Sequence, residues 1–446
     1  MQCRRRGRII RARLRAPLVR PALSVGLLGF GTVGARVYRL LSDRQTIAER
    51  AGGPLTVRRI AVADLEKDRE MKVPGDLLTA DAAAVVGASD VDIVVEVMGG
   101  RDQAGRLVRQ ALEAGKPVVT ANKQLMAEDG GDLLAVAARS GVDLCFEGSV
   151  GAGIPLIKPI RESLAAADLR AVTGILNGTT NYILTRMASE GYSYADALAE
   201  AQRRGFTEAD PAEDVDGRDS AAKLAILASA AFNVTLRGSD VFREGIERIT
   251  RKDLAYAREF GFAVKLLGIA RGAGGMIEAR VHPALLPLDH PLANVADEFN
   301  AVQVESEDLG PVIFTGRGAG GPPAAAAVVG DVIDVARNLR LGVSGRSRPA
   351  ARRAARIRPM EDVVLPYYLS LQLTDRPGVF ARVAAIFGEE GVSIASIVQK
   401  SRGEVADAVF VTHDAAERAV RRVVERLQSL EVVKAVTNRV RVEAKV

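Results

Sequence analysis

The chain has 446 residues, 48% of them hydrophobic, which is enough for two or three packed domains and excludes a disordered protein. Its formal net charge is +6, but residues 1–22 contain eight arginines and no acidic residue. Without those eight, 53 basic residues stand against 55 acidic ones, a net charge of −2, so the body of the chain lacks the charge of a nucleic-acid-binding protein.

The arginine-rich segment 1–22 is predicted to be a disordered basic tail or an overlong start. A targeting presequence and a nucleic-acid arm are the functional alternatives, and the segment lacks the serine enrichment of the former. Only Cys3 and Cys145 are present, so no disulfide framework is expected and a reducing cytoplasm fits. No window reaches about 18 uninterrupted apolar residues, so no membrane-spanning helix is expected.

The first predicted element is a strand from Leu23 that runs into the glycines of GFGTVG and is followed by an amphipathic helix. In such a motif Gly29 and Gly31 allow a tight turn and close approach of the backbone to a pyrophosphate. Gly34 allows the helix to pack closely on the strand. The spacing alone is weak evidence, but its place between a strand and a helix favours a dinucleotide site.

Strands and helices alternate beyond this motif, with a second strand predicted to end at Asp64 and the strand KPVVTANK predicted to end at Lys123. This alternation predicts a doubly wound parallel sheet with its ligand at the carboxyl ends of the strands. Asp64 would favour NAD by binding a ribose hydroxyl group, whereas Lys67 or Arg69 would favour the phosphate of NADP. The sequence leaves this choice open.

The segment EGSVGAGIPLIKPI follows a strand that contains Cys145 and is predicted to be a glycine-rich turn. The carbonyl groups of such a turn can surround a cation. Turn geometry alone also explains the glycines.

The segment from Gly205 to Ser229 places six carboxylates and Lys223 before and within the first turns of an apolar helix. Asp219 and Lys223 are four residues apart, so a helix that starts near Gly217 brings both to one face. One interpretation is a substrate site in which the lysine transfers protons. The other is a solvated acidic loop before a helix start, and the segment by itself favours neither.

The motifs GFGTVG, VTANK, EGSVGAGIPLIKPI and GILNGTTNYIL and the acidic segment occur in one order and together resemble homoserine dehydrogenase from about Leu23 to Leu341. The resemblance implies interconversion of L-homoserine and L-aspartate 4-semialdehyde with NAD or NADP, on the route to threonine, methionine and isoleucine. It also implies a homodimer or homotetramer.

The resemblance further implies roles for single residues. Lys223 would be the general acid and base at the hydroxyl or carbonyl group, Asp219 would orient the substrate, and Lys123 would lie between cofactor and substrate. Glu208 would receive the substrate ammonium group with the help of Asp214. The implied cofactor contacts are Gly29, Phe30, Gly31, Thr32, Val33, Gly34, Lys123 and Gly320. A monovalent cation, Na⁺ or K⁺, would bind near Glu147, Val150, Ala152 and Ile154, largely through backbone carbonyl groups.

Two positions depart from the family pattern. Ala63 stands where an arginine often precedes the aspartate, which weakens the case for NADP. Pro322 and Pro323 follow the late glycine run, where small helix formers are expected. Because proline is tolerated in a first helical turn, a shifted helix start is predicted without loss of the fold.

Residues 342–362 are predicted to be a solvated linker, and their arginines lack the interleaved aromatic residues of a nucleic-acid site. The order βαββαβ over residues 363–446 predicts a ferredoxin-like module. Its TDRPGVF segment resembles the effector loop of ACT domains, with Asp375 and the Gly378 amide as expected contacts and threonine as the expected effector. The alternative is a purely structural or dimerising module.

The predicted organisation is an α/β chain with a Rossmann-type dinucleotide-binding domain over 23–155, completed by 321–341, and an α+β substrate-binding and dimerisation domain over 156–320. One alternative enzyme is aspartate-semialdehyde dehydrogenase, which needs a cysteine nucleophile, but Cys145 has no obvious partner in the sequence. A catalytically silent amino-acid sensor is the other alternative. The presence of Lys123 and Lys223 beside the acidic cluster argues against it.

Overall fold

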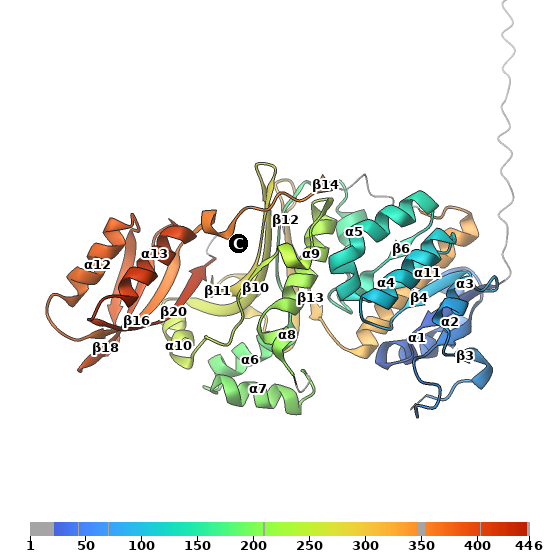
Figure 1. The fold of residues 1–446 in the computed structure, drawn as a ribbon, viewed down its shortest axis with the longest axis horizontal. Helices are drawn as coiled ribbons and strands as arrows, with labels where there is room; N and C mark the ends of the chain where they lie inside the picture. The colour runs from blue at the N-terminus through green and yellow to red at the C-terminus, as the bar shows by residue number, and fades with distance from the viewer. Residues whose placement is uncertain are drawn as a thin grey trace, which may run out of the picture.

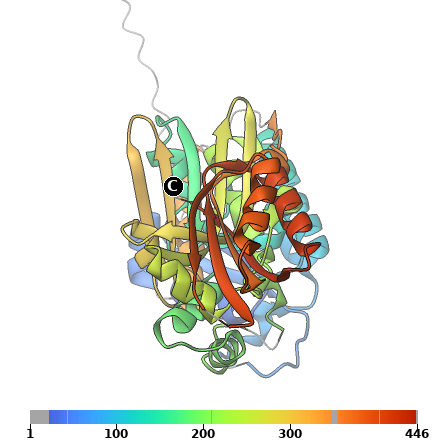
Figure 2. The ribbon, with the colours of Figure 1, turned by 90° about the vertical axis from the view of Figure 1, so that its left-hand side faces the viewer.

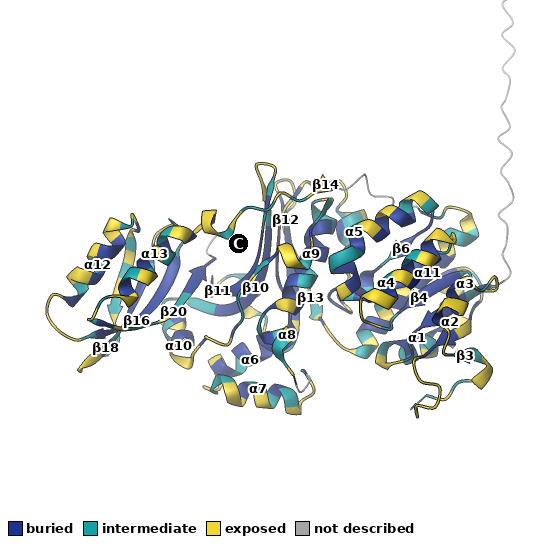
Figure 3. Ribbon diagram, in the orientation of Figure 1, coloured by how far each residue is buried: buried dark blue, intermediate teal, exposed yellow. Residues whose placement is uncertain are grey.

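The computed structural model describes residues 22–42, 44–69, 71–207, 210–345, 353–401 and 403–443. Three parts follow one another along its longest axis (Figure 1): a parallel sheet with its helices at one end, the C-terminal module at the other, and a mixed sheet with helices between them. The strands of the sheets are largely buried, whereas the helices expose their outer sides (Figure 3).

The parallel sheet has helices on both faces, as predicted. Its strand order is β3 (Leu78–Thr79), β2 (Leu55–Ala61), β1 (Leu23–Leu28), β4 (Ile93–Glu96), β5 (Val118–Thr120) and β6 (Leu144–Cys145). Helices α1 (Thr32–Ser42), α2 (Arg44–Ala51) and α11 (Gly321–Leu341) contribute to the core on one face, and α3 (Ala82–Gly87), α4 (Asp102–Glu113) and α5 (Lys123–Ser140) to the core on the other. Strand β1 is buried at every position except Ser24 because both of its faces are covered.

The mixed sheet begins in the middle of the chain and continues into the C-terminal module. Its order is β13 (Gly310–Arg317), β12 (Phe299–Ser306), β7 (Leu169–Ile175), β10 (Phe262–Ala273), β11 (Met276–Pro287), β20 (Val433–Val442), β16 (Tyr367–Thr374), β18 (Val405–Thr412) and β17 (Ile394–Gln399), with β9 (Phe242–Arg243) also paired to β11. Residues Ala284 and Leu285 of β11 pair in parallel with Arg441 and Val442 of β20. The module is therefore joined to the body by backbone hydrogen bonds.

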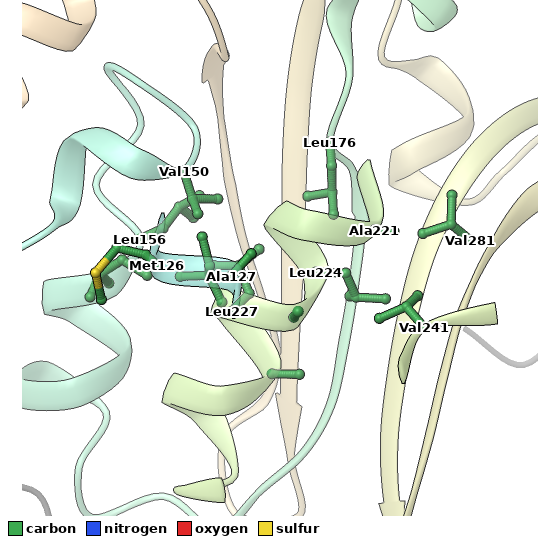
Figure 4. Close-up of a cluster of buried hydrophobic side chains, with 14 of the residues drawn as sticks. Met126, Ala127, Val150, Leu156, Leu176, Ala221, Leu224, Leu227, Val241 and Val281 are labelled. Carbon is green, nitrogen blue, oxygen red and sulfur yellow. The ribbon is translucent and has the colours of Figure 1, made fainter. Parts of the chain in front are cut away.

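The central helices are α6 (Gly178–Ser189), α7 (Tyr194–Arg203), α8 (Ala212–Val215), α9 (Arg218–Ala231) and α10 (Arg251–Glu259). Helix α9 lies between α5 and the mixed sheet (Figure 4). Leu227 of α9 lies near Met126 and Ala127 of α5, and Leu224 lies near Val241 on the other side. One continuous hydrophobic core thus joins the parallel-sheet part to the central part.

The C-terminal module has the predicted βαββαβ order, with α12 (Val379–Glu389) and α13 (Glu417–Gln428) between its strands. Figure 2 shows the two helices together on one face of the module's strands. Two short strands, β15 (Val364–Leu365) and β19 (Ala415–Ala416), pair beside them.

Several local predictions differ from the structure. Strand β2 ends at Ala61, three residues before Asp64. Strand β5 ends at Thr120, and Lys123 is the first residue of α5 because Asn122 caps that helix. The predicted linker is partly ordered, since β14 (Arg353–Ala354) pairs with β8 (Val234–Thr235). The predicted tail, apart from Ala22, lies outside the described residues.

Candidate active site

The glycines of GFGTVG occupy three different environments. Gly29 has φ 101°, and a Cβ atom there would lie 2.7 Å from the backbone of Val97 and Met98. A Cβ atom on Gly34 would lie 2.2 Å from the carbonyl oxygen of Gly29, so strand and helix touch at this point. A Cβ atom on Gly31 would meet nothing within 4 Å among the described residues. The open side of the loop therefore lies at Gly31, at the N-terminus of α1.

A second helix begins beside this loop. Gly320 has φ 117° and is the N-cap of α11, and a Cβ atom on Gly321 would lie 2.7 Å from Cγ2 of Thr32. Pro322 and Pro323 are tolerated in the first turn of α11 because an N–H group there has no acceptor within the helix. The positive ends of two helix dipoles therefore lie next to the glycine loop, an arrangement suited to a pyrophosphate.

Acidic and basic groups occur together after β2. The Asp64 carboxylate accepts a hydrogen bond of 2.9 Å from the Glu66 amide. The Arg69 guanidinium donates to the carbonyl oxygen of Asp64 and, at 2.7 Å, to that of Lys67. The two groups that the sequence offers for recognition of the cofactor ribose thus lie in one exposed loop.

A buried carboxylate joins two lysines from distant parts of the chain. Asp219 is 6% exposed, and one of its oxygens accepts from the Lys123 ammonium group. The other oxygen lies 2.8 Å from Nζ of Lys223 and accepts at 2.9 Å from the Asn177 side chain. Lys223 Nζ also donates to the carbonyl oxygen of Leu176 at 2.9 Å. The predicted one-turn spacing of Asp219 and Lys223 is confirmed.

Three helix N-termini converge to form this cluster. Asn122 caps α5 by accepting from the Leu125 amide at 3.0 Å, which places Lys123 at the first helical position. Asn177 caps α6 in the same way. Gly217 precedes α9 with φ 86°, a conformation that other residues rarely adopt. Asparagine caps thus fix the first turns of α5 and α6 at the site.

The charges of the cluster reinforce one another. Burial alone would raise the pKa of Asp219, but Lys223 and Lys123 oppose this and hold the pKa well below its usual range. Burial would lower the pKa of Lys123, yet the neighbouring Asp219 carboxylate outweighs burial and the pKa is raised. Asp219 and Lys123 are therefore a carboxylate and an ammonium group near neutral pH.

Asp214 lies on the other side of Asn177. Its carboxylate accepts from the Asn177 side chain at 2.7 Å and from the Thr207 hydroxyl group at 2.7 Å. Asn177 therefore bridges Asp214 and Asp219. Glu208, the other residue expected to bind the ammonium group, lies outside the described residues.

Sequence reasoning did not assign roles to Asn177 and Thr207. The sequence does contain a signal for Asn177, because it immediately precedes the helical part of GILNGTTNYIL and asparagine is a preferred N-cap residue. Thr207 gives no such signal, since its partner is recognisable only in the folded chain.

The turn after β6 is held by a buried carboxylate. Glu147 accepts from the backbone amides of Leu156, Ile157 and Lys158 at 2.5, 2.9 and 2.8 Å. Ala152 has φ 45°, in the left-handed region that is uncommon for alanine. The Glu147 carboxylate is thus occupied by amide groups of its own loop. The oxygen atoms suited to bind a cation are therefore those of the backbone carbonyl groups. Among the residues with described positions, no cluster of three or more His, Cys, Asp or Glu side chains could hold a metal ion.

Cys145 does not have the properties of a catalytic nucleophile. Burial holds the pKa of its thiol well above the ordinary value. A thiolate is the nucleophilic form, so this environment disfavours attack on an aldehyde. The site therefore does not support aspartate-semialdehyde dehydrogenase chemistry.

Asp375 and Gly378 lie on the exposed loop between β16 and α12. Gly378 has φ 86° and is the N-cap of α12, and the Asp375 carboxylate accepts from the Gly403 amide at 3.3 Å.

In the part of the chain that the structure describes, no helix is long and apolar enough to cross a bilayer.

Comparison with known proteins identifies the family. The family model described as homoserine dehydrogenase matches residues 155–333, its NAD-binding domain matches residues 29–147, and the ACT domain matches residues 367–432. The homoserine dehydrogenase of Corynebacterium glutamicum is 46% identical over 431 residues, which cover 95% of this chain and 96% of that protein. The chain belongs to the homoserine dehydrogenase family. The Bacillus subtilis homoserine dehydrogenase is 42% identical, covering 95% of this chain and 98% of that one.

Solved structures agree with this assignment. A homoserine dehydrogenase from Thiobacillus denitrificans superposes with a TM-score of 0.89 at 41% identity, covering 95% of this chain and 98% of that one. A hyperthermophilic archaeal homoserine dehydrogenase mutant in complex with NADPH gives 0.60 at 27% identity, covering 70% and 97%. The chain is thus an oxidoreductase with a nicotinamide cofactor, and its ACT domain indicates binding of a small-molecule effector.

Proposed function

We propose that the Asp219 cluster performs the interconversion of L-homoserine and L-aspartate 4-semialdehyde, with Lys223 as the group that carries the proton. The observation that carries this proposal is the single carboxylate shared by two lysines from the two halves of the active site. Bound NAD or NADP would supply the hydride acceptor or donor. In this division of the chain, residues 23–155 with 321–341 bind the cofactor and residues 156–320 bind the substrate.

The hydrogen bonds of Lys223 support the direction of proton transfer. An ammonium group has three N–H donors, and Asp219 and the Leu176 carbonyl group use two of them. Among the residues with described positions no other group accepts from Lys223, so the third N–H group can serve a substrate oxygen. In the reductive direction it would donate to the oxygen of the aldehyde as the alkoxide forms. In the oxidative direction the neutral amine would take the hydroxyl proton.

Asp214, Glu208 and Asp219 are proposed to bind and orient the substrate. A homoserine molecule carries an ammonium group, and Asp214 is a carboxylate whose two oxygens are fixed by Asn177 and Thr207. Such a fixed carboxylate can accept a charge-assisted hydrogen bond without reorganising. Lys123 is proposed to lie between this substrate and the cofactor held at Gly29 to Gly34 and Gly320.

Initial rates of homoserine oxidation with NAD and with NADP test the proposal. Lys223→Ala should lower kcat by at least about 10²-fold, the usual contribution of a general acid or base. Lys252→Ala, which removes another ion-paired lysine (Lys252 to Asp407, 2.8 Å), is the matched control and should keep the wild-type rate. Turnover of homoserine by Lys223→Ala at the wild-type rate would exclude Lys223 as the proton carrier.

A monovalent cation, Na⁺ or K⁺, is proposed to bind at the carbonyl groups of Glu147, Val150, Ala152 and Ile154. The left-handed conformation of Ala152 supports this, because strained backbone is maintained where it serves a site. The cation would stiffen the turn next to the cofactor. Replacement of Na⁺ and K⁺ by choline at constant ionic strength should lower the melting temperature, and an unchanged value would exclude the cation.

Threonine is proposed as the effector, bound at Asp375 and the Gly378 amide. Removal of the module is an unsuitable test, because β20 pairs with β11. Point substitution is preferable: Asp375→Ala should abolish inhibition of homoserine oxidation by L-threonine and keep the uninhibited rate. Equal inhibition of wild type and variant would exclude this loop as the threonine site.

A homodimer or homotetramer in the cytoplasm remains our expectation for the assembled enzyme.

A further inference from the structure

The boundary between the C-terminal module and the body contains a network of buried and partly buried charges. Arg441 of β20 is 1% exposed and lies between Glu417 of the module and Glu244 of the body. Its guanidinium group is 2.7 and 3.1 Å from the two Glu244 oxygens and 2.9 Å from each Glu417 oxygen. Arg439 also pairs with both glutamates at 3.1 Å. Two arginines of one strand thus hold Glu244 from the module side.

The backbone that carries Glu244 touches the catalytic segment directly. The amide of Ile246 donates to the carbonyl oxygen of Val215 at 3.0 Å. A Cβ atom on Gly245 would lie 2.3 Å from that same oxygen and 2.7 Å from Cα of Asp216, so only a glycine fits here. Val215 follows Asp214, and Gly217 is the N-cap of α9.

The two residues that precede Glu244 also lie beside the module and beside the catalytic cluster. The Arg441 guanidinium lies over the Phe242 ring, 5.2 Å from its centre. Arg243 lines a surface pocket of about 270 Å³ together with Lys123 and Asp219. Residues 242–246 therefore have one end in the module's charge network and the other against the segment that carries Asp214 and Asp219.

We propose that Glu244 is a positioning residue for the catalytic cluster, and that it is the carboxylate through which the C-terminal module acts on that cluster. Arg441 and Arg439 hold the Glu244 side chain, and its backbone holds residues 215–217 at the start of α9. A shift of β20 relative to β11 would move Glu244 and with it the carboxylates that flank Asn177. The inference rests on the proposed roles of Asp214 and Asp219.

The test uses Glu244→Gln in the full-length enzyme, with Glu278→Gln as the matched control. Glu278 also pairs with a buried arginine at this boundary, Arg280, at 2.7 Å, but none of its described contacts is to residues 214–219. We expect Glu244→Gln to lower kcat/KM for homoserine about tenfold or more, because small misplacements of reacting groups are costly. The KM for the cofactor should change less than about twofold, because the glycine loop is distant in the fold. Glu278→Gln should keep both constants.

Two further measurements separate positioning from a general loss of stability. Amide hydrogen exchange of residues 210–219 should be faster in Glu244→Gln and unchanged in Glu278→Gln. Arg439→Gln should lower kcat/KM in the same direction, and the double variant with Glu244→Gln should be no worse than Glu244→Gln alone, because both remove one interaction. An additive loss in the double variant would contradict the proposal that Arg439 acts through Glu244.

Unchanged kcat/KM in Glu244→Gln, or an equal loss in Glu278→Gln, would overturn the proposal. If Glu244→Gln does not fold, Arg439→Gln alone tests the same contact from the module side, and wild-type kinetics there would also overturn it. A wild-type enzyme without homoserine turnover would contradict the proposed function, while hydrogen exchange would still show whether Glu244 holds residues 210–219.

Discussion

Replacement of Gly31 by alanine separates cofactor binding from folding. An added Cβ atom at Gly31 would meet nothing within 4 Å of the described protein, and the residue has no left-handed φ that alanine would resist. The apo enzyme should therefore fold as the wild type does. The methyl group would instead occupy the open side of the loop, where a pyrophosphate bound at this loop, as proposed, would approach the N-terminus of α1.

The size of the effect follows from the contacts that a displaced pyrophosphate loses. A hydrogen bond from a backbone amide to a charged group contributes about 1.5–3 kcal/mol, and the helix dipole contributes about 0.3–1 kcal/mol. The sum of about 2–4 kcal/mol corresponds to an increase in Kd of about 30- to 700-fold. Titration calorimetry with NAD and with NADP measures this directly.

Gly34→Ala is the contrasting variant. Its Cβ atom would lie 2.2 Å from the Gly29 carbonyl oxygen, so we expect an overpacking cost of about 1–3 kcal/mol and a lower melting temperature without cofactor. Gly31→Ala should keep the wild-type melting temperature. Wild-type cofactor affinity in Gly31→Ala would refute the assignment of this loop to the pyrophosphate, and equal destabilisation by the two variants would refute the difference in their environments.

Three further predictions concern buried charges. Burial raises the pKa of Asp331 to about 8, so the folded carboxyl group keeps a proton that the unfolded chain loses between about pH 4 and 8. The free energy of unfolding should therefore fall by about 1.4 kcal/mol for each unit by which the pH rises in that range. Calorimetry of Asp331→Asn should show a free energy of unfolding that depends less on pH. Asp219→Asn should lower kcat/KM for homoserine at least about 10²-fold with little change in cofactor Kd, measured by initial rates and titration. Arg441→Met removes the most buried arginine that pairs with Glu244 and Glu417 and leaves them Arg439, so it should cost about 3 kcal/mol in thermal unfolding, whereas a loss below about 1 kcal/mol would contradict the network.

Local signals in the sequence were sufficient to predict much of the fold. GFGTVG lies between a strand and a helix, so the pattern of hydrophobic residues around it predicts the parallel sheet. Asp219 and Lys223 are one helical turn apart, so their shared face follows from spacing alone. The end of β2 was misplaced, because Val62 and Ala63 continue the apolar pattern after the sheet pairing has stopped at Ala61.

Long-range contacts could not be predicted in this way. Lys123 and Asp219 are 96 residues apart, and neither position carries a signal for the other. The pairing of β11 with β20 brings together Glu244 and Arg441, which are 197 residues apart. Such pairs are determined by the docking of whole elements, which a single sequence does not encode in any local pattern.

The hydrophobic core between α5 and α9 explains why Lys123 and Asp219 lie next to each other in the folded chain. Lys123 precedes Met126 and Ala127 on α5, and Asp219 lies two turns before Leu227 on α9 (Figure 4). These apolar side chains are buried in one cluster. Separation of the helices would expose them at about 1.5–3 kcal/mol for each large side chain, a cost that grows with every turn uncovered. Packing of α5 against α9 therefore sets the separation of the two helix starts that carry Lys123 and Asp219, and brings the lysine side chain within reach of the carboxylate.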